Sequence, residues 1–201
     1  MIAVIDHNYS NLKSICNALG FLKVSYEVIK PENLSERYSK AIIPGVGNFS
    51  KTMINLNKNS GKEKIFQFSK SKKKIMGICL GMQILASTGE ESVPTKGLNL
   101  IPGNVKKIQN NSKDYLPHIG WNTVKICKYH PVLEGVKDNM DFYFVHSYKF
   151  CPTNENYIVG QTYYSEKFSS IIANENVIGF QFHPEKSQKY GLKIINNFCN
   201  W

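Results

Sequence analysis

The sequence predicts an α/β fold: a single doubly wound domain over residues 1–201, with a largely parallel central sheet and a mixed or antiparallel extension. In the first half, short apolar runs that suit buried strands alternate with segments of helical periodicity. Repeated strand–helix units produce parallel sheets that are covered on both faces. In the second half, short strand-like runs are separated by Gly, Pro and Asn, which favours antiparallel pairing. No repeat, low-complexity tract or Gly/Ser linker divides the chain.

The first half begins with residues 2–5, a continuous apolar run that predicts a buried strand. Residues 11–19 carry apolar side chains at helical spacing, and Gly20 predicts the end of that helix. Three more strands are predicted, each followed by a turn and a helical stretch. They are residues 24–29, 41–43 and 74–78.

The second half predicts the extension of the sheet. Its strand-like runs are residues 105–108, 123–126, 142–145, 157–163 and 171–173. A last strand is predicted over residues 177–182. A C-terminal helix is predicted over residues 189–198, because its apolar residues fall on one stripe that can pack on the sheet.

The charge of the chain raises the question of a nucleic-acid partner. The net charge is +10, but only one of the 25 basic residues is an arginine, Arg37. Arginine is the side chain whose planar fork reads guanine edges and clamps phosphates. We therefore expect no nucleic-acid partner and only weak steering of anionic substrates or an acidic partner. No run approaches the ~20 apolar residues of a membrane span, so no membrane partner is expected.

The cysteines are odd in number and far apart, and none forms the close pair that a zinc site or a redox dithiol uses. They are Cys16, Cys79, Cys127, Cys151 and Cys199. We expect a reduced, cytosolic chain with no metal and no cofactor.

A candidate nucleophile stands in the segment Gly77-Ile78-Cys79-Leu80-Gly81, where a predicted strand turns into a helix. This is the Gly-x-nucleophile-x-Gly form of a nucleophile elbow, with Cys in place of Ser. The tight turn needs neighbours that have almost no side chain, and the N-terminus of a helix favours a thiolate. The alternative is a buried structural cysteine between two packing glycines.

A candidate base follows the last predicted strand. There the chain enters the sequence His183-Pro184-Glu185, and the proline favours extended backbone at His183. Residues two apart in extended chain point to the same side, so His183 and Glu185 can be neighbours. A carboxylate beside an imidazole fixes its tautomer and stabilises the imidazolium. The alternative is a strand-end histidine with an unrelated surface glutamate.

A third candidate is the glycine-rich loop over residues 42–47, which follows another predicted strand. Alone it predicts only a turn. Beside an elbow, such a loop is where an oxyanion hole would form, with the backbone N–H of Leu80 as a second donor.

Taken together, these segments resemble the class I (triad) glutamine amidotransferases, and among them the glutaminase subunits of imidazole glycerol phosphate synthases in histidine biosynthesis. The elbow and the His-Pro-Glu segment are typical of the superfamily. The segments Pro-His-Ile-Gly-Trp-Asn (117–122), Tyr-Phe-Val-His-Ser-Tyr (143–148) and His-Pro-Glu-Lys-Ser (183–187) point to this type of subunit. The resemblance covers nearly the whole chain, and its other matching segments are residues 43–47, 77–83, 97–98, 101–105 and 179–182.

The resemblance implies hydrolysis of L-glutamine to glutamate and ammonia through a cysteinyl thioester. Cys79 would attack the amide carbon, His183 would carry the proton and Glu185 would orient His183. The backbone N–H groups of Val46 and Leu80 would bind the oxyanion. The residues that the resemblance assigns to glutamine binding are Gly47, Gln83, Glu91, Ser147 and Tyr148. For Glu91 the alternative is a solvated loop acid.

The resemblance also implies a partner, a cyclase subunit of (β/α)₈ barrel fold that forms a heterodimer with the chain and receives the ammonia. The residues it assigns to this interface are Asn11, Trp121, Tyr143 and Lys186. Their alternative interpretations are a helix cap, two core aromatic residues and a solvated lysine.

One departure concerns the partner. The family usually follows the first strand with Asp-Tyr-Gly-x-Gly-Asn-Leu, whereas this chain has His7, Asn8 and Ser10 in that loop. A paralogous glutaminase that supplies ammonia to a different synthase, such as a sugar-modifying amidotransferase, is therefore the alternative. Relatives in pyridoxal phosphate, anthranilate and guanine nucleotide synthesis, and a catalytically silent assembly subunit, are two further interpretations.

Overall fold

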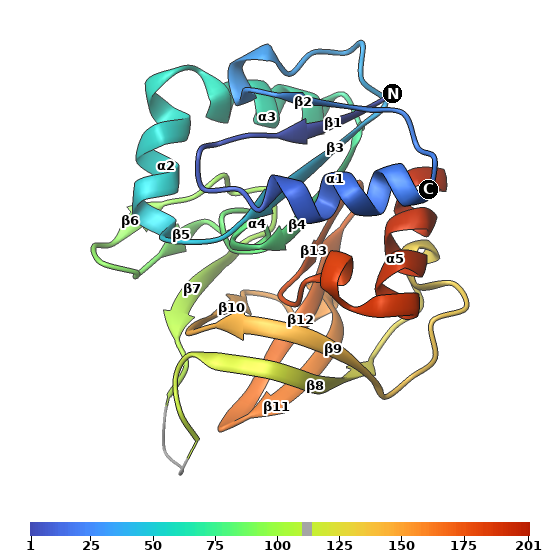
Figure 1. Ribbon diagram of the computed structural model, residues 1–201. Helices are drawn as coiled ribbons and strands as arrows, with labels where there is room; N and C mark the ends of the chain where they lie inside the picture. Colours follow the sequence, from blue (N-terminus) through green and yellow to red (C-terminus); the bar gives the residue numbers. More distant parts are fainter. Residues whose placement is uncertain (110–113) are drawn as a thin grey trace.

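The centre of the molecule is a sheet whose strands send alternate side chains into two apolar cores. In the computed structural model, which describes residues 1–109 and 114–201, β1 (Ile2–Ile5) directs Ala3 and Ile5 into one core and Ile2 and Val4 into the other (Figure 1). A strand that is buried on both faces needs apolar residues throughout. This is why the run at residues 2–5 is continuous, and the strand predicted there is confirmed.

The parallel part of the sheet has the order β2–β1–β3–β4–β13. The other strands of this part are β2 (Tyr26–Ile29), β3 (Lys40–Gly45), β4 (Lys74–Cys79) and β13 (Val177–Phe180). Parallel strands end at the same edge, and Gly45 is paired directly with Cys79 there. The carboxyl edge of the sheet therefore brings together the three candidate segments at the ends of β3, β4 and β13.

Helices cover both faces of the parallel part, as a doubly wound fold requires. Helices α1 (Leu12–Phe21) and α5 (Gln188–Asn200) pack on one face, and α2 (Phe49–Lys58) and α3 (Gly61–Lys70) pack on the other (Figure 1). The short helix α4 (Leu80–Gln83) follows β4 directly. The two chain termini lie on the same side of the molecule (Figure 1).

The chain after α4 extends the sheet, mainly through antiparallel pairs, and its strands β7 to β12 lie in the lower part of Figure 1. These strands are β5 (Thr88–Gly89), β6 (Thr95–Lys96), β7 (Gly103–Lys107), β8 (His118–Ile126), β9 (Met140–His146), β10 (Tyr148–Pro152), β11 (Ile158–Tyr164) and β12 (Glu166–Asn174). Strands β8 and β9 pair with each other along their length. The predicted fold class, an α/β domain with a mixed extension, is confirmed.

Several predicted boundaries are wrong. Gly20 does not end the first helix, which continues to Phe21, because one glycine costs a helix only about 1 kcal/mol. Strand β2 is followed by a 3-10 turn, Pro31–Asn33, and not by an α-helix. The last strand ends at Phe180, because the chain then turns toward β9, where the N–H of His183 donates to the Tyr143 carbonyl.

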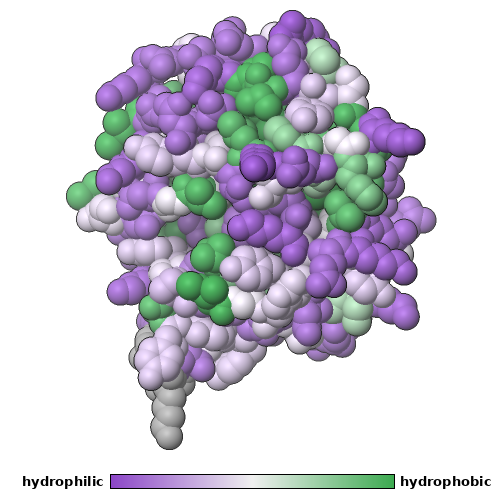
Figure 2. Space-filling view, viewed as in Figure 1, coloured by the Kyte–Doolittle hydropathy of each residue, from purple (hydrophilic) through white to green (hydrophobic). Residues whose placement is uncertain are grey.

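The surface in the view of Figure 1 is mostly hydrophilic, with hydrophobic side chains in small separate patches (Figure 2). Within residues 1–109 and 114–201, none of the helices has the length and apolar character that crossing a membrane requires.

Candidate active site

Cys79 occupies the sharp turn between β4 and α4, with φ of 54° and ψ of −109°. A non-glycine residue with this backbone is strained, which is a frequent property of functional positions. The neighbouring glycines permit the turn. A Cβ on Gly77 would lie 2.5 Å from the carbonyl oxygen of Gly81, and a Cβ on Gly81 would lie 1.7 Å from that of Ile43. The Gly-x-Cys-x-Gly spacing is therefore required by backbone contact, as the predicted elbow implies.

The Cys79 sulfur makes polar contacts with Val145 and Gln181. The thiol donates to the carbonyl oxygen of Val145 at 3.7 Å, and the side-chain Nε2 of Gln181 lies 3.8 Å from the sulfur as a donor. Cys79 is buried except toward the cavity described below.

His183 and Glu185 form the predicted pair. The Nδ1–Oε1 distance is 2.8 Å, and each side chain is only 1% exposed. The backbone conformation that brings the two side chains together differs from the predicted one. His183 is extended, as predicted, but Glu185 lies in a 3-10 turn, Pro184–Lys186. Ser187 stabilises this turn, since its hydroxyl donates to the His183 carbonyl at 2.7 Å and accepts the N–H of Tyr143 at 3.0 Å.

The charge state of His183 depends on both of its neighbours. Burial favours the neutral imidazole, but interactions with Cys79 and then with Glu185 outweigh it and raise the pKa of His183 to about 10. Nδ1 is held by Glu185, while Nε2 has no hydrogen-bond partner in the described part of the chain. The imidazole is thus oriented to take a proton from the thiol and to hold it as an imidazolium.

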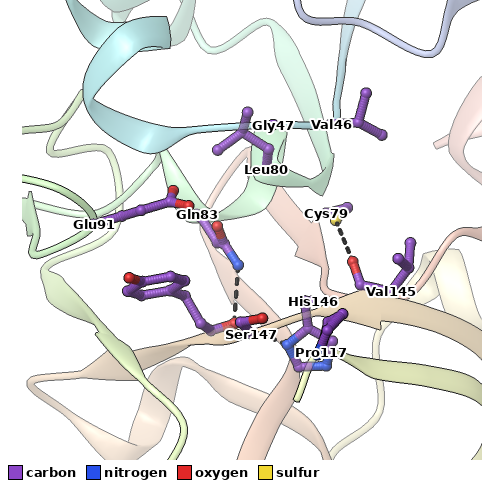
Figure 3. A pocket seen from close by; sticks show the side chains of 11 residues that line it. Val46, Gly47, Cys79, Leu80, Gln83, Glu91, Pro117, Val145, His146 and Ser147 are labelled. Carbon is purple, nitrogen blue, oxygen red and sulfur yellow. Dashed lines mark hydrogen bonds between the residues drawn. The ribbon is translucent and has the colours of Figure 1, made fainter.

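Cys79 opens into a cavity of about 250 Å³ (Figure 3). Its lining includes every residue that the family resemblance assigns to glutamine binding: Gly47, Gln83, Glu91, Ser147 and Tyr148. These residues come from the loop after β3, from α4, from the segment before β6 and from the bend between β9 and β10. The fold therefore gathers them from four parts of the chain.

Two of these side chains also hold the cavity together. The Nε2 of Gln83 donates to the Tyr148 carbonyl at 3.0 Å, which Figure 3 marks with a dashed line, and lies 3.1 Å from Oε1 of Gln181. The carboxylate of Glu91 accepts the N–H of Phe49, the first residue of α2, at 2.7 Å. A negative charge at a helix N-terminus is stabilising, so Glu91 caps α2 as well as lining the cavity.

The loop after β3 is held in a conformation that the sequence did not predict. The N–H of Val46 donates to the Tyr9 carbonyl at 2.8 Å, so it is not open to a ligand in this conformation. Leu80 is the first residue of α4, and its N–H has no partner within the helix. His7, which the sequence marked only as a departure from the family pattern, lies 2.6 Å from the Pro44 carbonyl through Nε2.

Three of the four predicted interface residues lie together. Trp121 on β8 faces Tyr143 on β9, with ring centroids 6.2 Å apart, and the Lys186 ammonium lies 5.7 Å from the centre of the Tyr143 ring. Trp121 is 49% exposed, so its interpretation as a core residue is wrong. Asn11 precedes α1 without capping it through its side chain, and its Oδ1 accepts the Ser14 hydroxyl at 3.3 Å.

Sequence reasoning gave no role to three buried polar residues near the cavity: His118, His146 and Gln181. The available signal was their position inside the matching segments 117–122, 143–148 and 179–182, where a polar residue interrupts an apolar run.

Known proteins resemble this chain in sequence and in fold. The family described as glutamine amidotransferase class-I matches residues 3–200. The imidazole glycerol phosphate synthase subunit HisH of Methanocaldococcus jannaschii is 48% identical over 201 residues and covers 98% of each chain. The protein of the same name from Pelagibacter ubique is 42% identical over 205 residues and covers 99% of each. PurLQS from Thermotoga maritima shares the fold, with a TM-score of 0.79 at 16% identity over 99% of this chain and 97% of that one. The chain therefore belongs to the class-I glutamine amidotransferase family.

Proposed function

We propose that the chain hydrolyses L-glutamine to glutamate and ammonia, as the glutaminase subunit of an imidazole glycerol phosphate synthase in histidine biosynthesis. The observation that carries this proposal is the cavity into which Cys79 opens. It is lined by the five predicted glutamine-binding residues, and Cys79 acts electrostatically on the buried His183–Glu185 pair. The relatives named above, which are described as subunits of this synthase, support the pathway.

The chemistry follows from the positions of three side chains. The Cys79 sulfur attacks the side-chain carbonyl carbon of glutamine, and His183 takes the thiol proton through Nε2. His183 then gives this proton to the amide nitrogen as the C–N bond breaks, and ammonia leaves. A water molecule cleaves the thioester, with His183 accepting its proton and returning it to the thiolate, so that glutamate and the starting enzyme are released. Glu185 keeps Nδ1 protonated throughout.

The tetrahedral intermediate needs backbone donors for its oxyanion. Leu80 supplies one as the first residue of α4. Val46 becomes the second when its N–H is released from the Tyr9 carbonyl. A change in the loop after β3 is thus part of the proposed reaction.

The ammonia has to reach a partner before it is protonated, because ammonium is not a nucleophile. We infer a heterodimer with a cyclase subunit of (β/α)₈ barrel fold. The candidate interface is the group formed by the exposed Trp121 and Lys186 with the half-buried Tyr143, together with Asn11. Lys186 follows Glu185 directly, so interface and active site share one short turn.

We further infer one cytosolic domain over residues 1–201 that uses neither a metal nor a cofactor. The family match over residues 3–200 supports the domain, and the five free cysteines support a reducing compartment.

The test is glutamate release from glutamine by the purified chain, alone and with the histidine-pathway cyclase of the same organism and its nucleotide ligand. We expect strong stimulation by the cyclase, complete loss in Cys79→Ala and no change in Cys127→Ala, which alters an exposed cysteine instead. Absence of turnover under all conditions would overturn the glutaminase assignment. Turnover without stimulation or complex formation would overturn the pathway and favour a paralogue that serves a different synthase.

A further inference from the structure

Two buried histidines lie next to each other beside the cavity that Cys79 opens into, with ring centroids 5.1 Å apart and ring planes inclined by 66°. His118 is the first residue of β8, His146 is the last residue of β9, and the two are directly paired across the strands. The His118 ring lies between the rings of Phe144 and Tyr164, with centroids 4.9 and 3.9 Å away. Both histidines are buried, so packing determines the orientation of the His118 ring.

The hydrogen bonds of this pair have one consistent direction. Nδ1 of His146 lies 2.8 Å from the Tyr148 carbonyl, and a carbonyl only accepts, so Nδ1 carries the hydrogen. A neutral imidazole has one N–H, so Nε2 of His146 must accept from Nδ1–H of His118, 3.0 Å away. Nε2 of His118 in turn accepts from the side-chain amide of Asn122 at 3.2 Å. Every ring nitrogen of the pair is thus satisfied by one arrangement of protons.

Two further observations support this direction. The amide of Asn122 is oriented independently, because Nδ2 donates to the Tyr163 carbonyl at 3.0 Å and Oδ1 accepts the N–H of Thr123 at 2.8 Å. Burial lowers the pKa of His118 to about 4 and that of His146 to about 3, so both rings are neutral at pH 7.

The chain of hydrogen bonds ends in the cavity. Ser147 is the single bend residue between β9 and β10, and Figure 3 shows the His146 ring beside it. The His146 side chain crosses this bend to the Tyr148 carbonyl, which also accepts from Gln83. His146 therefore holds in place the piece of backbone that forms one side of the pocket.

We propose that His118 and His146 are positioning residues of the glutamine pocket: the directed chain from Asn122 through both imidazoles holds the Ser147–Tyr148 backbone where the amino-acid end of glutamine binds. The identity of the substrate rests on the proposed function. Neither imidazole touches the reacting atoms, so the chain acts on binding and not on the chemical step.

A pair of variants separates positioning from stability. His146→Leu removes the donor to Tyr148, whereas His146→Asn places an amide N–H near the position of Nδ1. We expect the KM for glutamine to rise about tenfold or more in His146→Leu with kcat within about twofold, and to return most of the way in His146→Asn. Val124→Ala, a cavity-forming change on the same strand as His118, should lower stability and leave KM unchanged. Equal KM values in all three variants would overturn the proposal.

A second measurement uses the unaltered chain. Nitrogen-15 NMR of the imidazoles should find both His118 and His146 neutral and in the Nδ1–H tautomer at pH 7. An Nε2–H tautomer in either ring contradicts the chain of hydrogen bonds. This measurement does not depend on turnover. A chain that fails to hydrolyse glutamine would overturn the proposed function, and the tautomers would still show whether the chain of hydrogen bonds exists.

Discussion

The backbone N–H of Val46 donates a 2.8 Å hydrogen bond to the carbonyl oxygen of Tyr9, which links the loop after β3 to the loop after β1. The same N–H is the second donor of the proposed oxyanion hole. In this conformation the proposed hole therefore lacks its second donor, and the N–H of Leu80 remains as the first.

This relationship predicts a weak glutaminase in the free chain. One missing oxyanion donor costs about two to three orders of magnitude in kcat. We expect glutamate release by the free chain to be slower than that of the complex by at least this factor, and the Val46 amide hydrogen to be protected from exchange only in the free chain. Full activity in the free chain, or an equally protected Val46 amide in the active complex, would contradict this mechanism.

His7 provides a second link to the same loop, because its Nε2 lies 2.6 Å from the Pro44 carbonyl. His7→Phe removes this bond. It should stabilise the conformation in which the Val46 N–H is released from Tyr9 by about 1 kcal/mol relative to the present one, or about fivefold in population. We expect the basal glutaminase rate to rise several-fold while the stimulated rate changes little. His130→Asn, a histidine change in another part of the chain, should leave both rates unchanged; an unaltered basal rate in His7→Phe would show that this bond does not restrain the loop.

Glu185→Gln tests the orientation and charge of His183. A glutamine oxygen can still accept from Nδ1, but the loss of the negative charge lowers the pKa of His183. We expect kcat/KM for glutamine to fall by roughly two to four orders of magnitude, while the complex with the cyclase still forms. The steady-state rate of glutamate release measures the effect. A loss of less than about tenfold would assign Glu185 a structural role only.

His130 predicts a pH dependence of stability. Burial, assisted by the charge of Lys74, lowers the pKa of His130 to about 4, whereas the unfolded chain protonates near pH 6.5. Between these two pH values the unfolded state binds more protons than the folded state. The contribution of His130 to the free energy of unfolding is therefore complete above pH 6.5 and is lost as the pH falls, by at most about 1.4 kcal/mol per pH unit.

His130→Asn isolates this contribution. Nδ1 of His130 accepts the N–H of Val132, and an asparagine oxygen can replace it as the cap. The free energy of unfolding in urea is measured for the unaltered chain and for the variant. At pH 7.5 the two values should be similar. From pH 7.5 to pH 5 the variant should lose less stability than the unaltered chain. Parallel pH profiles would show that His130 titrates normally in the folded state.

Trp121→Ala tests the candidate interface. Because Trp121 is 49% exposed in the free chain, its removal should change the free energy of unfolding by no more than about 0.5 kcal/mol. If Trp121 anchors the cyclase, the Kd of the complex should rise by at least about tenfold, measured by calorimetry. Tyr129→Ala, which removes another exposed aromatic ring, serves as the control. If Trp121→Ala and the unaltered chain bind the cyclase with equal affinity, the interface does not include Trp121.

The sequence was most informative where local rules dominate. Continuous apolar runs predicted β1 and the core of β4, and the Gly-x-Cys-x-Gly spacing predicted a turn that only glycines permit. The His183–Glu185 contact was predicted as well, although the chain reaches it through a 3-10 turn. Strands β5, β6 and β10 were missed, because two-residue strands have no periodicity and β10 is separated from β9 by only Ser147.

The sequence by itself therefore determined the fold class and the candidate nucleophile, because these depend on periodicity and on the small size of glycine. It also indicated the candidate base through the His-Pro-Glu segment, whereas the residues around them were assigned by the family resemblance. Only the tertiary structure decided what the polar groups do. The Val46 N–H is occupied by Tyr9, Glu91 caps α2, and His118 and His146 share one directed chain of hydrogen bonds. Each of these partners is 28 or more residues away in sequence. Hydrogen bonds between distant residues depend on atomic positions within a few tenths of an ångström, which no local pattern of residue types contains.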